Sequence, residues 1–293
     1  MAVAEPVVAD VGGIIPRFRR VSSLFEARQR IRPLDQALLL LFLLVAIGSL
    51  IAPWFAPHNP IAASGVPLQP PSRSALFGTD QAGRDVLSRV LYGMRTSWIA
   101  ALIVIASGML VGGVIGLVAG ASGGWVAGAL MRLTDAFLAL PAPVMAIAVV
   151  GALGPSFAHV LLAVSIVWWP YYARIVRADV RALVVRPHIE AARLSGTRRL
   201  RLWTRHLLPG TLPSLLVAAS LDVGNLLLML AGLSFLGLGA PQPAPELGAT
   251  TALGLPYLLV QWWVPIFPAL AILLLAFLAN TGGDALRSLL SDR

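Results

Sequence analysis

The sequence predicts an all-α, polytopic membrane protein with six transmembrane helices. Of its 293 residues, 58% are hydrophobic and only 12% are charged, and the mean hydropathy is +0.82. A soluble domain needs a polar surface, and roughly a quarter of all its residues are charged. The chain also contains six apolar runs of the length that a membrane-crossing helix requires. Together these observations exclude a soluble, a disordered and a fibrous protein.

Each span is identified by an apolar run and by the polar or helix-breaking residues that border it. The second run carries glycines at about four-residue spacing, which lets helices approach closely in lipid. The third contains Asp135 and is interrupted by Pro141 and Pro143. A Gly-Pro-Ser turn at 154–156 precedes the fourth, and the fifth carries Asp222. The predicted spans are residues 34–55, 97–121, 129–153, 157–176, 212–236 and 262–280.

The distribution of the arginines predicts how these spans are oriented in the membrane. All 22 basic residues are Arg, against 13 acidic residues. Six lie in the first 33 residues and nine in 174–205, whereas the two larger loops on the opposite side carry four and none. Arginine collects on the cytoplasmic side of membrane proteins, so both termini are expected to be cytoplasmic. Because the Arg clusters border apolar spans, we expect membrane lipids rather than nucleic acid as their partner.

This topology divides the chain into a leader, a first helix, an extracytoplasmic loop, a core and a tail. Their predicted bounds are 1–33, 34–55, 56–96, 97–282 and 283–293 respectively, with a cytoplasmic segment at 187–209 inside the core. Trp98, Trp168, Trp169, Trp262 and Trp263 lie at or near span ends. Indole rings favour the lipid headgroup region, which is where we expect these side chains.

The cytoplasmic segment has the pattern of two short helices. Pro187 suits a first helical position, and Gly196 suits a helix end because it tolerates a left-handed backbone. A second, Arg-rich helix is expected to stop before Pro209. Ala191 and Ala192 leave a low surface over which a partner could approach closely. From the residues alone, this segment either lies on the membrane or docks into a protein groove.

Four motifs resemble those of ABC importer permeases. The sequence EAARLSG at 190–196, followed by HLLP at 206–209, resembles the EAA loop of that family. Three further stretches resemble its peptide and nickel branch: FGTDQAGRDVLSR at 77–89, WPYYARIVR at 169–177, and LSFLGLG at 233–239 with PELG at 245–248. The resemblance covers about residues 34–290 and is to the second of two paired permease subunits. The chain departs from the family pattern at Leu230, near which an acidic residue is usual, and at Leu194-Ser195.

This resemblance implies the type I importer permease (MetI-like) fold and a set of partners. These are a second homologous permease subunit, two cytosolic ATPase subunits and an extracytoplasmic substrate-binding protein, in the bacterial inner membrane. The implied cargo is a dipeptide or oligopeptide, with nickel or a nickel chelate as the alternative. The implied ATPase-coupling residues are Glu190, Ala191, Ala192, Arg193, Gly196, His206 and Pro209.

The chain is not expected to be an enzyme. A phosphate-binding Walker A loop requires Lys, and this sequence has none, so ATP and Mg are expected on the partner subunits. Cys is absent and the four His are scattered, so neither a catalytic set nor a metal site is expected. An ion-coupled secondary transporter remains the alternative of a different class, with Asp135 beside Pro141 and Pro143 as its one indication.

The first extracytoplasmic loop contains a group of opposite charges. Asp80, Arg84, Asp85 and Arg89 could interlock as ion pairs, which makes a metal site between the two carboxylates a minor alternative. From Asp85 onward the apolar pattern predicts an amphipathic helix lying along the membrane. The loop is either a brace at the pore mouth or part of the surface that faces the binding protein.

Three polar residues lie within predicted spans. Asp222 and Asn225 are three residues apart and therefore share a helical face. They line the translocation pathway or contact the partner permease, or else they form a hydrogen bond between helices. For Asp135, a local ion pair with Arg132, three residues away, is the preferred interpretation.

Overall fold

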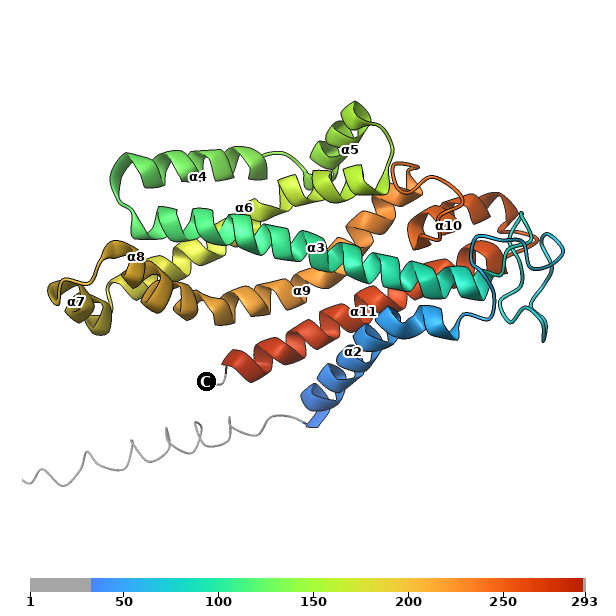
Figure 1. The fold of residues 1–293 in the computed structure, drawn as a ribbon, viewed down its shortest axis with the longest axis horizontal. Coiled ribbons are helices and arrows are strands. Elements are labelled where there is room, and N and C mark those ends of the chain that lie inside the picture. The colour runs from blue at the N-terminus through green and yellow to red at the C-terminus, as the bar shows by residue number, and fades with distance from the viewer. Residues whose placement is uncertain (1–32, 292–293) are drawn as a thin grey trace, which may run out of the picture.

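The computed structural model describes residues 33–291, and all regular elements in that range are helices (Figure 1). Nearly all of the predicted leader lies outside the described residues. The elements in chain order are α2 (Pro33–Ile51), η2 (Ala52–Phe55), α3 (Val86–Ala121), α4 (Gly124–Leu138), α5 (Ala142–Leu153), α6 (Phe157–Val184), α7 (Pro187–Leu194), α8 (Arg199–Leu202), η3 (Trp203–Leu207), α9 (Leu208–Phe235), α10 (Leu247–Gly254), η4 (Leu255–Tyr257) and α11 (Trp263–Ser291).

Five of the described helices are long and apolar enough to cross a membrane, and a bent pair makes a sixth if it counts as one span. The bent pair is α4 and α5, which meet at 85°. The third predicted span is therefore not one straight helix. Pro141 stands at the N-cap of α5 and Pro143 in its first turn. A proline cannot continue a helix from the preceding turn, so the chain changes direction there.

Several helices extend beyond the predicted spans. Helix α3 begins at Val86 rather than at residue 97, α6 continues to Val184, and α11 includes residues 283–291 of the predicted tail. Apolar runs mark only the lipid-facing length of a helix, whereas hydrogen bonding continues into polar turns outside it. The predicted separate amphipathic helix after Asp85 is wrong for this reason, because it is the first part of α3.

The longest contact within the bundle is between α3 and α6. A Cβ atom added at Gly116 would lie 2.5 Å from the carbonyl oxygen of Ala173, and one at Gly120 would lie 2.7 Å from the Cβ of Val180. A Cβ at Gly112 would meet the carbonyl oxygen of Trp169. The predicted close approach at these glycines is confirmed. Without side chains on this face of α3, the two backbones are in direct contact.

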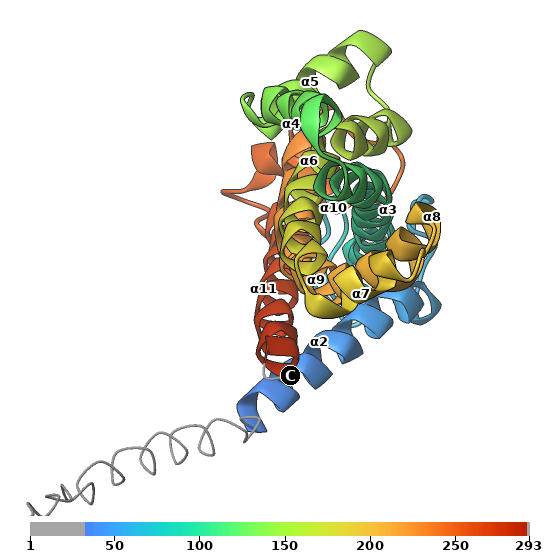
Figure 2. The same cartoon turned by 90° about the vertical axis from the view of Figure 1, so that its left-hand side faces the viewer.

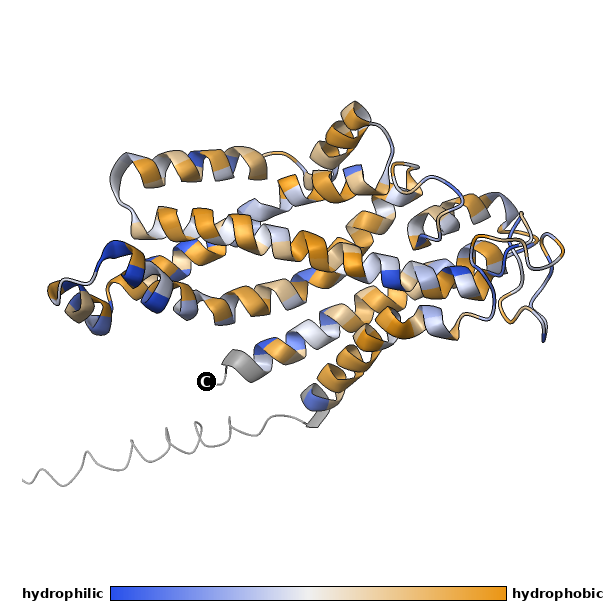
Figure 3. Cartoon of the chain, viewed as in Figure 1, coloured by the Kyte–Doolittle hydropathy of each residue, from blue (hydrophilic) through white to orange (hydrophobic). Residues whose placement is uncertain are grey.

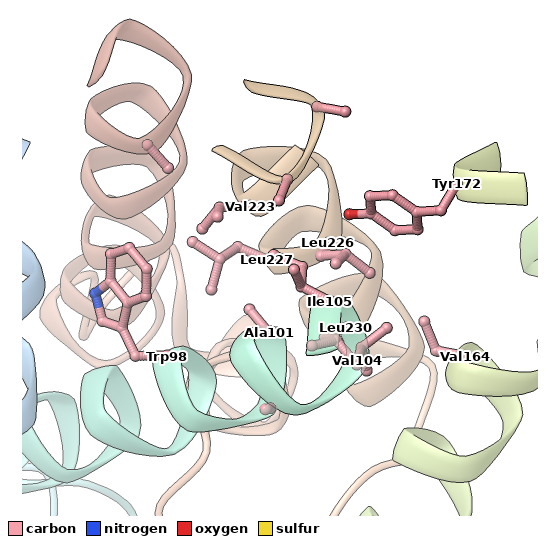
Figure 4. Close-up of a cluster of buried hydrophobic side chains, with 14 of the residues drawn as sticks. Trp98, Ala101, Val104, Ile105, Val164, Tyr172, Val223, Leu226, Leu227 and Leu230 are labelled. Carbon is pink, nitrogen blue, oxygen red and sulfur yellow. The ribbon is translucent and has the colours of Figure 1, made fainter. Parts of the chain in front are cut away.

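The apolar core lies between α3, α6 and α9 (Figure 4). Leu230, at the position near which the family usually carries an acidic residue, is 3% exposed in this core. Trp98 is 3% exposed in the same cluster. Trp169 and Trp263 are also buried inside the chain, so these three indoles pack against other helices and are not exposed on the surface of the bundle.

The long helices consist mainly of hydrophobic residues, drawn orange in Figure 3, and many of their large apolar side chains are exposed. On α2, which lies beside α11, large side chains such as Leu40, Leu44 and Ile47 are more than half exposed. Leu273 and Phe277 of α11 are about 60% exposed. Such a surface is stable in hydrocarbon and would be unstable in water. The basic segment of α7 and α8 lies at one end of the bundle, and the loop before α3 lies with α10 at the other (Figure 2 views the first end).

The contact between α3 and α6 predicts a position-specific effect of adding one methyl group. Gly116→Ala should destabilise the protein by about 1–3 kcal/mol, because the new Cβ overlaps the Ala173 carbonyl and forces the helices apart. Gly113→Ala is the matched control, since nothing lies within 4 Å of a Cβ built there. Thermal unfolding in detergent measures both. Equal melting temperatures for the two variants would contradict the close contact.

Candidate functional site

The segment 187–209, which was predicted to be cytoplasmic, begins with α7, and the ends of this helix match the prediction. Pro187 lies in the first turn of the helix, and Gly196 has a positive φ of +74° after its last residue. The Gly196 N–H donates to the Arg193 carbonyl at 3.0 Å, and the Thr197 N–H donates to the Ala192 carbonyl at 3.2 Å. This pair of hydrogen bonds is the Schellman arrangement that ends a helix at glycine.

The second helix of the segment was predicted to stop before Pro209. Instead, the helix continues past this residue. Helix α8, a π-turn at Trp203–Leu207 and α9 form one continuous helix over residues 199–235. In the π-turn the Leu208 N–H donates to the carbonyl of Trp203. This wider turn accommodates Pro209, which has no N–H to donate and whose ring would collide with a regular preceding turn. The segment is therefore joined rigidly to a membrane-spanning helix.

The side chains of the segment divide into buried anchors and an exposed face. Ile189, Leu202 and Leu207 are at most 4% exposed and attach the segment to the bundle. Glu190 and Arg193 are exposed, and Glu190 forms no ion pair with any described residue. Of the other coupling candidates, Ala191, Gly196 and Pro209 are exposed, whereas Ala192 and His206 are half-buried. Large apolar side chains are exposed as well: Val185 (78%), Leu194 (84%) and Leu200 (71%).

At the opposite end, the charged loop is held together by Asp80 and Arg89. Asp80 is 2% exposed, and its Oδ1 accepts hydrogen bonds from the N–H groups of Ala82 (2.8 Å) and Arg84 (2.9 Å). Its Oδ2 lies 3.6 Å from Nε of Arg89 and 3.8 Å from the guanidinium of Arg84. The predicted network is thus confirmed for three of its four members.

The fourth member, Asp85, is a helix cap and not part of the arginine network. Its carboxylate accepts hydrogen bonds from the N–H (2.8 Å) and the hydroxyl (2.6 Å) of Ser88 in the first turn of α3. Sequence spacing cannot distinguish the two roles, because Asp suits both an ion pair and an N-cap. The described residues contain no group of three or more His, Cys, Asp or Glu that could hold a metal.

Arg89 joins three segments that are distant in sequence. It is 1% exposed, and its guanidinium donates to the carbonyl oxygens of Pro60 (3.0 Å) and Pro243 (3.1 Å). It also donates to the hydroxyl of Thr250 in α10 at 3.4 Å. These partners could not be predicted from the sequence. Every residue has a backbone carbonyl group, and a single threonine forms no recognisable motif. The geometry supports a brace at this end of the bundle.

Glu246 is a buried helix cap, a role that was not predicted from the sequence. It is 3% exposed and caps α10, accepting a hydrogen bond from the Ala249 N–H at 2.7 Å. Burial raises the pKa of Glu246, and the hydrogen bonds from backbone N–H groups oppose that rise. The PELG motif at 245–248 was the available signal, because an acidic residue often precedes a helix.

Asp222 connects α9 with α6. It is 6% exposed, and its Oδ2 accepts hydrogen bonds from Nε1 of Trp168 and, at 3.0 Å, from the hydroxyl of Tyr172. This arrangement is the helix–helix hydrogen bond that was one of the two predicted alternatives. Trp168 lies in the middle of α6 and not near either end of that helix. Asn225, in contrast, is exposed.

Asp135 was predicted to form an ion pair with Arg132 on its own helix. Instead, it pairs with a residue of another helix. Its Oδ1 lies 2.6 Å from the guanidinium of Arg174, so the pair links α4 to α6. Both side chains are more than half exposed, at 58% and 56%. Arg174 is 39 residues away, and only the packing of the two helices brings it into reach.

Comparison with known proteins assigns the chain to a family. Residues 112–293 match the family described as binding-protein-dependent transport system inner membrane component. The chain is 42% identical over 264 residues to the probable D,D-dipeptide transport system permease protein of Escherichia coli, covering 89% of this chain and 88% of that protein. It is 38% identical to the di/tripeptide permease of Pseudomonas aeruginosa, covering 87% and 86% of the two chains.

A nickel transport system permease protein of Escherichia coli is 36% identical, with 85% of this chain and 90% of that protein covered. All three relatives align along most of their length, and each is named as a transport permease. The chain therefore belongs to the family of binding-protein-dependent transport system inner membrane components, and it is a permease component of an ABC importer of the peptide or nickel type.

Proposed function

We propose that this chain forms half of a heterodimeric pore for dipeptides or oligopeptides, opened by two cytosolic ATPase subunits that act on the segment 187–209. The observation that carries this proposal is the arrangement of that segment. It places α7 at the end of the bundle, with polar and apolar side chains exposed, and a turn at 195–198 joins α7 to the continuous helix over residues 199–235.

The exposed face of the segment fits a protein groove better than a lipid surface. Leu194 and Leu200 supply apolar area at the loop, and Ala191 permits close approach beside them. Glu190 adds a carboxylate with no ionic partner in the described part of the chain, and a basic group of the ATPase would neutralise it. Because the sequence has no Lys for a Walker A loop, ATP and Mg are assigned to the partner subunits, and this chain is not itself an ATPase.

The proposed force follows a continuous path into the membrane. Movement of α7 pulls on α8, which is the first turn of the helix 199–235. Asp222 on that helix is hydrogen-bonded to Trp168 and Tyr172 of α6, so α9 and α6 move together. The π-turn at Trp203–Leu207 lies between the coupling residues and the bundle, and π-turns often mark functional sites.

The proposed second permease covers a face that lipid cannot cover well. The exposed Asp135–Arg174 ion pair lies between α4 and α6, and charged groups within membrane helices normally face protein or an aqueous path. An apolar cleft of about 520 Å³ lies nearby between α5, α6 and α9, lined by residues such as Ile147, Trp168 and Met229. Both features favour a protein partner on this side.

Two named relatives support a peptide as the cargo, and a third supports the nickel alternative. The dipeptide and di/tripeptide permeases are 42% and 38% identical to this chain, and the nickel permease is 36% identical. Membership of a binding-protein-dependent family also favours ATP-driven import over the ion-coupled alternative. Uptake of labelled peptides and of nickel by cells with the whole system distinguishes the two cargoes.

The proposal predicts a charge-reversal effect confined to α7. Glu190→Arg should reduce peptide uptake about tenfold or more, because an added cation would repel the basic ATPase group proposed to meet Glu190. The matched control is Asp284→Arg, which makes the same change at another exposed acidic residue, on α11. Uptake by reconstituted complexes measures the effect, and immunoblots of membranes monitor insertion. Unchanged uptake in the first variant would refute the coupling role.

The hydrogen-bond arrangement at Asp222 separates a packing role from a pathway role. Asp222→Ala should destabilise the protein by about 1 kcal/mol, since interhelical hydrogen bonds in membranes average ~0.6 kcal/mol each and two are lost. Transport and melting temperature should fall together, and Asp222→Asn, which retains an acceptor, should restore most of both. A loss of transport at an unchanged melting temperature would assign Asp222 to the pathway instead.

The cytoplasmic placement of both termini predicts the labelling pattern of single cysteines. Ala63→Cys in the loop before α3 should react with an impermeant maleimide applied from outside, whereas Leu200→Cys should react only after the membrane is permeabilised. The chain has no natural Cys, so each label reports one position. Labelling of both positions from the same side would invalidate the proposed orientation.

A further inference from the structure

A cleft of about 610 Å³ lies between the coupling segment and the turn that joins α3 to α4. Both lie at the same end of the bundle (Figure 1). One wall is formed by Arg193, Thr197, Arg199 and Trp203, and the other by residues 121–126, including Ser122 and Gly123. The apolar residues Leu194 and Leu200 and the carboxylate of Glu190, which carry the proposed ATPase contact, do not line this cleft, and Arg193 is the one coupling candidate that does.

The cleft is lined by positive charge, and no carboxylate of the described residues neutralises it. Its lining includes two arginines and no acidic residue. Within residues 33–291, no carboxylate lies within 4.0 Å of the guanidinium of Arg193 or of Arg199. Residues 186–206 hold six Arg and one Glu, and the blue stretches of the ribbon at α7 and α8 in Figure 3 mark the hydrophilic residues there. Two unpaired guanidinium groups beside one cavity favour an anion.

The polar groups around the cleft suit a phosphate in particular. Guanidinium groups bind phosphate oxygens in a forked geometry, and the hydroxyls of Thr197 and Ser122 can donate to further oxygens. The first turn of α4 also borders the cleft, and its N-cap, Gly123, offers no side-chain acceptor to the free N–H groups. Those groups add to the attraction that the arginines already provide.

The position of the cleft is that of the inner-leaflet headgroups. Trp125, beside the lining residue Val126, is 83% exposed, and an exposed indole at a helix end is typical of the membrane interface. Trp203 and Val126 give the cleft an apolar side, against which a glycerol backbone can pack. This placement depends on the proposed cytoplasmic orientation but not on docking of an ATPase.

From this chemistry we infer that the cleft binds the phosphate of an anionic phospholipid of the inner leaflet. The lipid phosphate contacts the coupling segment and the α3–α4 turn at once, and so holds the segment in the position seen here. The affinity of the segment for the lipid is then linked to its movement, because a ligand that prefers one position stabilises that position. A soluble phosphate compound presents the same charged group without acyl chains and is the alternative source.

Lipid retention by the full-length chain in complex with its permease and ATPase partners tests this inference. The complex is exchanged into nanodiscs of phosphatidylcholine with or without phosphatidylglycerol, and bound lipid is counted by native mass spectrometry. Arg199→Gln removes a cleft residue, and Arg201→Gln is the matched control, because it removes the same charge two residues away, outside the lining. Thr197→Val is a second, uncharged test of the cleft. Elution profiles and melting temperatures confirm that each variant is folded.

The expected result is about tenfold weaker retention of phosphatidylglycerol in Arg199→Gln, a smaller loss in Thr197→Val, and near-normal retention in Arg201→Gln. Equal losses in both Arg variants would overturn the inference, since diffuse charge attraction would then suffice. Displacement of the lipid by glycerol 3-phosphate or inorganic phosphate at similar concentration would assign the cleft to a soluble phosphate. Loss of all bound lipid when the ATPase subunits join the bare permease pair would assign it to a protein contact.

Discussion

The rest of the structure depends on the direct contact between the backbones of α3 and α6. Glycines at positions 112, 116 and 120 remove the side chains of α3 from this contact, and a single methyl group at Gly116 would overlap a carbonyl of α6. Lipid tails are as apolar as leucine, so helices associate in a membrane through close packing and hydrogen bonds rather than through a hydrophobic force. This contact fixes the rotation of α6, which in turn aims Trp168 and Tyr172 at Asp222 on α9.

The two ends of the bundle are built for different tasks. At the end with α10, Arg89 and Asp80 are buried and held by an ion pair and several hydrogen bonds, and the helices there are capped by Asp85 and Glu246. Those interactions are costly to break, because each would leave a buried charge or donor without a partner. At the end with α7, a few apolar anchors hold the segment, and its charged groups are exposed. An end closed by buried polar contacts, opposite an end with exposed charged groups, suits a protein on which a partner acts from one side.

Much of this organisation could be predicted, and the errors have a common cause. The apolar runs correctly predicted the membrane helices, and Pro187 and Gly196 correctly predicted the two ends of α7. These signals depend only on residues that are neighbours in the sequence. Helix ends outside the lipid were misjudged, since polar turns continue α3 and α6 without an apolar signal. A helix end was predicted before Pro209, but the π-turn accommodates this proline and the helix continues. Asp85 and Asp135 were given wrong partners, because several groups at suitable spacing compete for each carboxylate.

By itself, the sequence determined that the chain lies in a membrane, where its helices are, which end carries the basic segment and, through its motifs, which family it resembles. These properties follow from local composition and from short spacings along the chain. Only the tertiary structure decided that Arg174 pairs with Asp135, that Trp168 and Tyr172 meet Asp222, that Arg89 joins three segments, and that Arg193 and Arg199 line one cleft with the α3–α4 turn. Each of these contacts depends on the rotation and depth of a helix against its neighbours. Close packing sets that geometry, and no spacing within one helix encodes it.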